Sequence, residues 1–198
     1  MNEFWETRYS SPTYAYGTQP NEFFKQCIDT LPPGRVLLPA EGEGRNAVYA
    51  ARQNWAVDAF DFSEAGRQKA LQLAETFGIK FAYTIDTFAE IDVPENTYGL
   101  IGLIYAHMPS VERKVVHKRL ISFLKPGGFV ILEAFHKEQL GNPSGGPKDS
   151  DMLYNRTDLL EDFNELNILQ LEEVYTDLNE GPFHHGSACV IRLVAKKK

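Results

Sequence analysis

The chain has 198 residues and a formal charge of −7 at pH 7, from 20 Lys and Arg against 27 Asp and Glu. With 43% hydrophobic and 24% charged residues, its composition is that of an ordinary globular protein with enough chain to build a full core. The acidic balance argues against nucleic-acid and anionic-membrane partners, because both require surfaces with clustered Lys and Arg.

The cysteine pattern and the first residues of the chain argue against a secreted or membrane-spanning protein. Cys27 and Cys189 are too few for a secreted disulfide scaffold and too far apart for a zinc motif, so we expect buried free thiols and no metal site. The segment 1–6 lacks the basic start and apolar stretch of a signal peptide. Apolar runs stay far below the ~20 residues that span a bilayer. We expect a soluble, cytoplasmic protein with a single domain over 1–198.

Helix and strand signals alternate through the first half of the chain. In chain order we expect a helix over 21–30, a strand over 35–38, a helix over 46–53, a strand over 56–61, a helix over 63–77 and a strand over 80–83. Ser63 is the expected N-cap of the third helix. The core-facing stripe of that helix is Ala70, Leu73, Ala74 and Phe77.

The second half continues the alternation and then ends in two strands. We expect a strand over 100–104, a helix over 110–123, a turn over 125–128, a strand over 129–132, a helix from a Thr157 cap to about 165, and strands over 169–178 and 188–195. His117 stands among basic residues, which indicates a solvated surface. The pattern predicts an α/β fold with a Rossmann-like, doubly wound, seven-stranded and mostly parallel sheet. The short last link predicts an antiparallel C-terminal hairpin strand.

A glycine-rich loop between the first strand and the following helix is the most informative segment. Its pattern Gly42-x-Gly44-x-x-Ala47 fits the dinucleotide-type fingerprint, in which backbone N–H groups and a helix N-terminus face the ligand. Asp61 ends the second strand, where an acid accepts hydrogen bonds from ribose hydroxyls; Asp58 is the alternative but lies mid-strand. Together, the glycine loop and Asp61 predict a ligand with an adenosine-like ribose. They do not distinguish NAD from S-adenosylmethionine.

Four segments together resemble the class I S-adenosylmethionine-dependent methyltransferases. "LLPAEGEGRNAVYAA" resembles the first motif of that family, "AVDAFDFSEAG" the second, and "FLKPGGFVILEAF" the turn into the fifth strand. The opening "WETRYSSPTYAYGTQPNEFF" is similar to the small bacterial branch with tellurite-resistance and thiopurine-type methyltransferases. The resemblance covers nearly the whole chain.

The resemblance implies a set of cofactor contacts for S-adenosylmethionine. Gly42 and Gly44 would pack against its methionine part, Asp61 would bind its ribose, and Phe62 would flank its adenine. An N-terminal arm, residues 1–20, would close over the cofactor. The other implied cofactor-binding residues are Tyr16, Gly17, Ala40, Glu41, Asn46, Ser63, Asp86, Thr87, Tyr105, Ala106 and His107.

The chain departs from the family pattern at three places. Leu38-Pro39 stands where the family usually carries an acid near the end of strand one, and Ala40 replaces the first loop glycine. Gly99 occupies the place of a frequent acid before strand four. We expect Glu41, with Glu43 as the alternative, to hold the methionine ammonium instead.

Methyl transfer from a sulfonium needs mainly proximity and orientation, with a base only where the acceptor must lose a proton. His107 and His136 follow the fourth and fifth strands and are the candidate bases. Aromatic faces favour a cationic sulfonium. The candidate residues for the acceptor region are Trp5, Tyr9, Tyr14, Arg156 and His184.

The sequence therefore predicts an S-adenosylmethionine-dependent methyltransferase that acts on a small-molecule acceptor, with a thiol or a metalloid anion favoured and S-adenosylhomocysteine as product. The alternatives are an NAD(P)-dependent oxidoreductase and a non-catalytic S-adenosylmethionine-binding protein. We expect a monomer or a weak homodimer.

Overall fold

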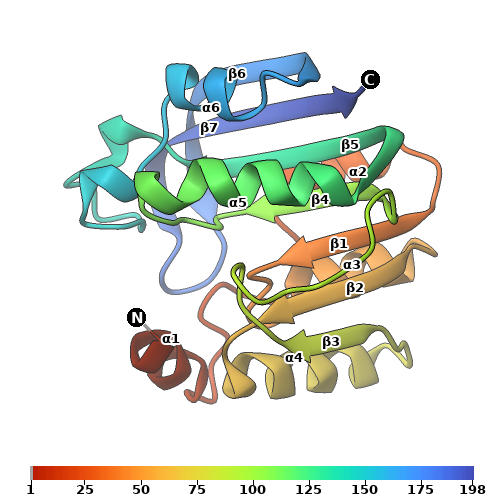
Figure 1. Ribbon diagram of the computed structural model, residues 1–198. Coiled ribbons are helices and arrows are strands. Elements are labelled where there is room, and N and C mark those ends of the chain that lie inside the picture. The colour runs from red at the N-terminus through yellow and green to blue at the C-terminus, as the bar shows by residue number, and fades with distance from the viewer. Residues whose placement is uncertain (1) are drawn as a thin grey trace.

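The computed structural model describes residues 2–198 and shows a sheet between two layers of helices (Figure 1). Its seven strands follow the order β3-β2-β1-β4-β5-β7-β6. Strand β7 is antiparallel to β5 and β6, and the other neighbouring strands are parallel. The predicted fold class is confirmed, including the antiparallel C-terminal hairpin. Met1, at the start of the predicted arm, lies outside the described residues.

The elements follow the predicted order. The strands are β1 (Arg35–Pro39), β2 (Ala56–Asp61), β3 (Ala82–Ile85), β4 (Tyr98–Ile104), β5 (Leu124–Phe135), β6 (Leu166–Asn179) and β7 (His185–Lys197). The helices are α1 (Asn2–Tyr9), α2 (Glu22–Ile28), α3 (Arg45–Arg52), α4 (Glu64–Thr76), α5 (Ser110–Phe123) and α6 (Arg156–Asp162), with short 3-10 turns at Lys137–Gln139 and Ser150–Met152. Among residues 2–198 we find no helix with the length and apolar character that a membrane crossing needs.

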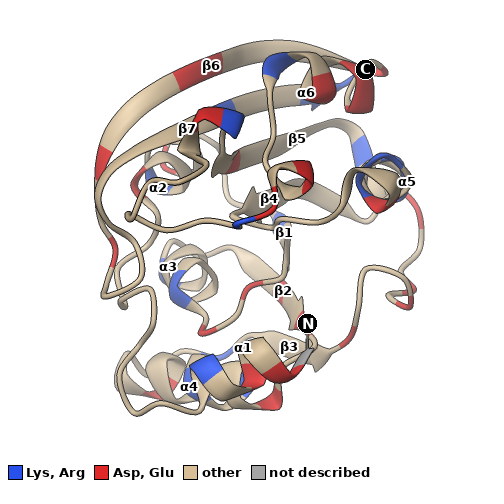
Figure 2. Cartoon of the chain, turned by 90° about the vertical axis from the view of Figure 1, so that its left-hand side faces the viewer, with Lys and Arg blue, Asp and Glu red and all other residues tan. Residues whose placement is uncertain are grey.

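Each face of the sheet is covered by its own apolar core. Helices α2, α3 and α4 pack on one face through Phe24, Ala50 and Ala70, while α5 and α6 pack on the other through Leu120 and Leu159. The helices of these two layers do not cover the carboxyl ends of β1, β2 and β4. These ends lie at one edge of the sheet and lead into the loops that follow the strands (Figures 1 and 2).

Some local predictions are wrong in position. The cap of α6 is Asn155, whose side chain accepts from the Asp158 N–H, and not Thr157. Phe77 does not join the core stripe: it is exposed, and Arg52 lies 4.3 Å over its ring. Strand β3 begins two residues later than expected. Helix α1 was not predicted, because its residues show no cap and no apolar stripe. The Ser63 cap is confirmed, since its side chain accepts from the Gly66 N–H.

His117 is the clearest error, because it is fully buried and not solvated. Its Nδ1 lies 2.9 Å from Asp162 Oδ2, and Arg113 Nε donates to the same oxygen at 2.7 Å. Burial lowers the pKa of His117, so the ring is neutral and donates to the carboxylate. This buried pairing fastens α5 to α6. Its partner lies 45 positions away, so the local run of basic residues around His117 gave no sign of it.

The two cysteines are free, as expected; Cys189 is buried and Cys27 half-buried. At the outer edge of the sheet, β6 runs for 14 residues with a register shift between Ile168 and Gln170. Its exposed acidic side chains are Glu172, Glu173 and Asp177. The edge strand therefore combines unusual length with negative charge.

Candidate functional site

The loop after β1 adopts a left-handed backbone at three positions, with φ of 51° at Ala40, 58° at Gly42 and 86° at Gly44. Gly44 has a packing reason as well: a Cβ there would lie 2.4 Å from the Ala70 Cβ of α4. Because both glycines are needed to turn the chain and bring α3 against α4, the loop presents backbone atoms at the sheet edge. The predicted glycine loop thus takes the shape that a backbone-binding ligand requires.

Asp61 joins this loop to the end of β2. Its Oδ2 accepts from the Gly42 N–H at 3.1 Å and its Oδ1 from the Ser63 N–H at 2.9 Å. The Asp86 N–H donates to the Asp61 carbonyl at 3.1 Å, which brings the end of β3 alongside. Burial raises the pKa of Asp61 to about 6. Each carboxylate oxygen has the capacity to accept a further hydrogen bond, which is what a ligand with hydroxyl groups requires.

The two glutamates of the loop have different partners. Glu43 forms a buried ion pair with Lys69 at 2.5 Å and accepts from the Ala15 N–H at 2.7 Å, which ties the N-terminal arm to α4. Glu41 Oε1 accepts from the Asn46 and Ala47 N–H groups at the start of α3. Burial raises the pKa of Glu41 to about 7. Glu41 has no cationic side chain at ion-pair distance among residues 2–198, so it is the better candidate for a ligand ammonium.

Helix α1 lies over the glycine loop. The Tyr9 hydroxyl lies 2.6 Å from the position that a Cβ on Gly42 would take, and the Trp5 ring stacks on Tyr9 at 5.5 Å. Glu6 accepts from the Ser63 hydroxyl at 2.6 Å and so holds α1 to the start of α4. Tyr14 donates to the Lys69 carbonyl at 3.0 Å on the outer side of α4. Of these predicted aromatic residues, Tyr9 and Trp5 are near the loop.

The arm also meets the loop between β6 and β7. The Phe183 N–H donates to the Ala15 carbonyl at 3.3 Å, and the Arg8 guanidinium lies 4.2 Å over the Phe183 ring. A Cβ on Gly181 would lie 2.5 Å from the Gly17 nitrogen, so the two backbones are in close contact. Figure 2 looks onto this edge of the sheet, with α1 below and the β6–β7 loop reaching down toward it. Two segments from opposite ends of the chain thereby enclose the edge.

Five rings gather at the ends of β4 and β5; we call them the aromatic cluster. Its members are Tyr16, Tyr105, His107, Phe135 and His184. His184 is central, with ring centroids 4.3 Å from Tyr16, 4.5 Å from Tyr105 and 5.1 Å from Phe135. Tyr105 is held at φ 53°, a left-handed position that is uncommon outside glycine. The structure therefore brings two predicted residues, Tyr16 of the arm and Tyr105 after β4, against His184.

A buried polar network supports this cluster. Asn21 Nδ2 donates to Glu133 at 2.6 Å and to Glu180 at 2.9 Å, and the Tyr105 hydroxyl donates to Glu133 at 2.9 Å. Arg45 pairs with Glu180 at 3.0 Å, and Arg192 with Glu133 at 2.6 Å. Both arginines are thus neutralised inside the fold. Glu133 could have been suspected from the sequence, because it interrupts the apolar run "FVILEAF". Glu180 and Asn21 carried no such signal.

The ring nitrogens of His107 are both engaged by backbone. Nδ1 donates to the Met152 carbonyl at 2.7 Å, and Nε2 accepts from the Phe135 N–H at 3.2 Å. Burial lowers the pKa of His107 to about 4. The ring is therefore neutral and fixed in orientation, which suits a wall of the site better than a proton carrier.

Several predicted residues lie on the same sheet edge, and others lie apart from it. Phe62 and Thr87 are half-buried there, and Ala106 is buried, with its carbonyl accepting from Tyr154. Arg156 instead donates to the Leu171 carbonyl of β6. His136 faces Glu138, Glu173 and Cys189 and is not a member of the aromatic cluster.

Comparisons with known proteins agree with this geometry. Residues 36–128 match a family model described as a methyltransferase domain. No curated protein matches the sequence. A solved structure from work on the conversion of a disulfide bond into a thioacetal group during echinomycin biosynthesis is similar at a TM-score of 0.79 and 14% identity, covering 100% of this chain and 92% of that one.

Two further solved structures are similar. TehB from Haemophilus influenzae has a TM-score of 0.75 at 15% identity, covering 100% of this chain and 67% of that one. An S-adenosylmethionine-dependent methyltransferase from Clostridium acetobutylicum has a TM-score of 0.66 at 16% identity, with 87% and 88% covered. The chain has the fold of the class I S-adenosylmethionine-dependent methyltransferases, and residues 36–128 match the methyltransferase-domain model. The methyltransferase activity and the cofactor expected from the sequence are supported by these findings.

We expect cofactor affinity to fall on acidification. Protonation of Glu41, with its pKa of about 7, and of Asp61, at about 6, removes the charges that the sequence assigns to the ligand ammonium and ribose. Between pH 6 and 5 the dissociation constant of S-adenosylmethionine should therefore rise about 50-fold, roughly ninefold through Glu41 and roughly fivefold through Asp61, as titration calorimetry can measure. Glu41→Gln should flatten the part of this profile near pH 7.

The unfolding free energy of the ligand-free protein should respond in the opposite sense. Raised pKa values mean that the folded state binds more protons than the unfolded chain, in which Glu41 has its ordinary value of 4.5. Between about pH 4.5 and 7, the contribution of these groups to the unfolding free energy therefore falls as pH rises.

For the binding experiment, a cofactor affinity that is independent of pH over this range would contradict the assignment of both carboxylates.

Proposed function

We propose that this protein transfers a methyl group from S-adenosylmethionine to a small-molecule acceptor, a thiol or a metalloid anion, and releases S-adenosylhomocysteine. The observation that carries the proposal is the contact between Asp61 and the Gly42 N–H at 3.1 Å. It places an acid with free acceptor capacity against a left-handed glycine loop, at the sheet edge where this fold binds ligands. These residues fit the ribose and the methionine part of the cofactor.

The chemistry asks the protein for position and not for a covalent intermediate. S-adenosylmethionine supplies an electrophilic methyl carbon on a sulfonium, and the acceptor lone pair displaces the thioether in line. The aromatic cluster lines the end of β4, where we place this reaction. Ring faces of Tyr105 and Tyr16 favour a neighbouring cation by about 0.5–2 kcal/mol. Orientation of the acceptor and the methyl group toward each other supplies the larger part of the rate enhancement.

The state of the histidines favours an acceptor that is already nucleophilic. Burial lowers the pKa values of His107 and His184, so both rings are weak bases at neutral pH. An alcohol or a protonated amine would need a stronger base. A thiolate or a metalloid anion needs none, because its lone pair is available without a proton transfer in the site.

Enclosure of the edge by the arm and by the β6–β7 loop favours a small acceptor over a macromolecule. The Gly17 and Gly181 backbones are in close contact, and Gly17 directly follows Tyr16 of the aromatic cluster. Sulfur chemistry in the solved relative that concerns a disulfide and a thioacetal agrees with a thiol acceptor. We extend the proposal to a single domain with the 1–20 arm as its cover, a cytoplasmic location, no nucleic-acid partner, and a monomer or weak homodimer.

The first test is the thermal midpoint with S-adenosylmethionine, S-adenosylhomocysteine, NAD and NADP in parallel. A ligand at about 100 times its dissociation constant stabilises by about 2.7 kcal/mol, which corresponds to roughly 5–10 °C for a protein of this size. We expect this shift with the two S-adenosyl compounds alone. A shift with NAD alone would instead identify an oxidoreductase. Binding without turnover on a broad panel of thiols and metalloid anions would identify a cofactor-binding protein.

His184 offers a test of the acceptor side with a matched control in the next residue. His184 is buried in the aromatic cluster, whereas His185 is exposed. His184→Ala removes the central ring, so we expect kcat/KM for S-adenosylhomocysteine formation to fall about 10- to 100-fold, while His185→Ala leaves it unchanged. Equal rates in both variants would rule out the aromatic cluster as the reaction centre.

A further inference from the structure

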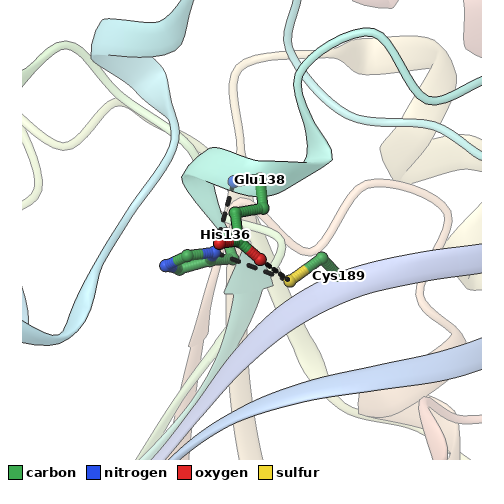
Figure 3. Close-up of side chains that lie close together, drawn as sticks. All are labelled: His136, Glu138 and Cys189. Atoms are coloured by element: carbon green, nitrogen blue, oxygen red, sulfur yellow. Dashed lines mark hydrogen bonds between the residues drawn. The ribbon is translucent and has the colours of Figure 1, made fainter.

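A second group of reactive side chains lies between the end of β5 and strand β7, apart from the aromatic cluster. It consists of His136, Glu138 and Cys189 (Figure 3). His136 Nδ1 lies 3.5 Å from Cys189 Sγ, and Glu138 Oε2 lies 3.9 Å from the same sulfur. All three potential ligand atoms lie within 4.8 Å of one another.

The two distances from the sulfur, 3.5 Å and 3.9 Å, are close to those around a tetrahedral metal ion. With Zn–S of about 2.3 Å and Zn–N or Zn–O of about 2.0–2.1 Å, tetrahedral angles place the sulfur about 3.5 Å from each neighbouring ligand atom. The donor set is one thiolate, one imidazole and one carboxylate. It suits Zn²⁺ and does not suit Ca²⁺ or Mg²⁺, which prefer oxygen ligands. From this geometry we infer that His136, Glu138 and Cys189 form a three-ligand site for Zn²⁺, which leaves a fourth position for water.

The surroundings of His136 prepare it as a ligand through Nδ1. Its Nε2 lies 3.4 Å from Glu173 Oε1, and its Nδ1 accepts from the Glu138 N–H at 3.2 Å. This pattern puts the proton on Nε2 and the lone pair on Nδ1, so a metal bound at Nδ1 would take the place of the hydrogen bond from the Glu138 N–H. A carboxylate behind a ligating histidine fixes the ring and increases its basicity. Glu173 on β6 takes this place.

The backbone around the site is held as firmly as the side chains. The His136 N–H donates to the Cys189 carbonyl at 3.0 Å, and the Cys189 N–H donates to Gln139 Oε1 at 2.8 Å. Cys189 and His136 are buried, whereas Glu138 is exposed and leaves a way in from solvent. The Tyr175 hydroxyl donates to Glu138 Oε2 at 2.6 Å and holds that carboxylate toward the sulfur. Bound Zn²⁺ would join the end of β5 to β7.

From the spacing of the cysteines alone we expected no metal site, and the inferred Zn²⁺ site differs from that expectation. The ligands come from a His-x-Glu pair and a cysteine more than 50 positions later, a separation that matches no zinc motif. It is also independent of the proposed methyl transfer, because none of the three residues lies in the aromatic cluster. Metal alone can therefore test it, with neither cofactor nor acceptor present.

Co²⁺ is the probe that distinguishes this site from others, because thiolate ligation gives a near-ultraviolet charge-transfer band and tetrahedral geometry gives intense visible bands. We expect one equivalent of Co²⁺ to produce both in the metal-stripped full chain, and Zn²⁺ to abolish them. Cys189→Ser should lose the charge-transfer band, and Cys27→Ser, which removes the other thiol, should retain it. Thermal midpoints of both variants without metal establish that they are folded.

Two further variants separate ligands from support. His136→Ala should weaken Co²⁺ binding at least as much as Cys189→Ser does, whereas Glu173→Gln should weaken it about 10- to 100-fold and keep the bands. The inference is overturned if the wild-type chain gives no thiolate band with one equivalent of Co²⁺. A band that survives in Cys189→Ser and disappears in Cys27→Ser would overturn it equally. Neither result would bear on cofactor binding.

Discussion

Asp61→Ala is expected to weaken S-adenosylmethionine binding at least about 100-fold. The substitution removes the only groups that we assign to the ribose hydroxyls and frees the Gly42 N–H, to which Asp61 is bonded at 3.1 Å. Hydrogen bonds to a charged group contribute about 1.5–3 kcal/mol each, so the loss of two exceeds the roughly 2.7 kcal/mol of a 100-fold change. Titration calorimetry at pH 8, where Asp61 is ionised, measures the effect directly.

The matched control for this experiment is another aspartate of β2. Asp58 lies mid-strand and pairs with Arg35 at 2.6 Å on the surface. Asp58→Asn should bind the cofactor as the wild-type chain does, because Asp58 is not part of the proposed ribose site. The loss of its surface ion pair should also cost little stability. If Asp58→Asn weakens binding while Asp61→Ala does not, the ribose site has been assigned to the wrong acid of the strand.

Asp162→Ala is expected to lower the unfolding free energy by about 3 kcal/mol. The variant leaves Arg113 buried with only Asp158 at 3.4 Å, and His117 without its acceptor. Burial alone would raise the pKa of Asp162, but hydrogen bonds from His117 and Arg113 bring it below its ordinary value, so the carboxylate is charged at neutral pH. Breaking a buried pair by removing one partner typically costs 3–5 kcal/mol, and the remaining Asp158 places this site at the lower end.

Denaturant titration or calorimetry can check this loss, with an expected fall in melting temperature of about 6–12 °C. Glu161→Ala is the control, because Glu161 is the exposed neighbour in the same helix. A surface substitution of this kind changes stability by no more than about 0.5 kcal/mol. Equal stability of the two variants would mean that the Asp162 contacts do not hold α5 against α6.

The sequence was sufficient for the parts of the fold that repeat locally. Strands and helices were predicted in the right order because apolar periodicity and cap residues such as Ser63 are local signals. The glycine loop and Asp61 were predicted to act together because parallel strands place their carboxyl ends on one edge. The hydrogen bond between Asp61 and the Gly42 N–H was not itself predicted, although the shared sheet edge makes it possible.

Contacts between distant segments could not be predicted in the same way. His117 was expected in solvent because the neighbouring side chains are basic, while its acceptor belongs to α6. Phe135 and His184 come from β5 and from the last loop, and only the closed sheet brings their rings to 5.1 Å. Helix α1 was missed for a related reason: Glu6 and Tyr9 are held by contacts with α4 and the glycine loop, not by a helical pattern of their own.

The long edge strand β6 bears on how copies of the protein meet one another. One side of this 14-residue strand offers unpaired N–H and C=O groups to solvent, the arrangement that invites another strand to add on. Glu173 and Asp177 lie on one face of the strand and Glu172 on the other, so two such edges would bring like charges close together, and like charges repel. Added salt screens that repulsion within about 10 Å at 0.1 M. Pairing between copies of this protein along β6 should therefore increase with ionic strength.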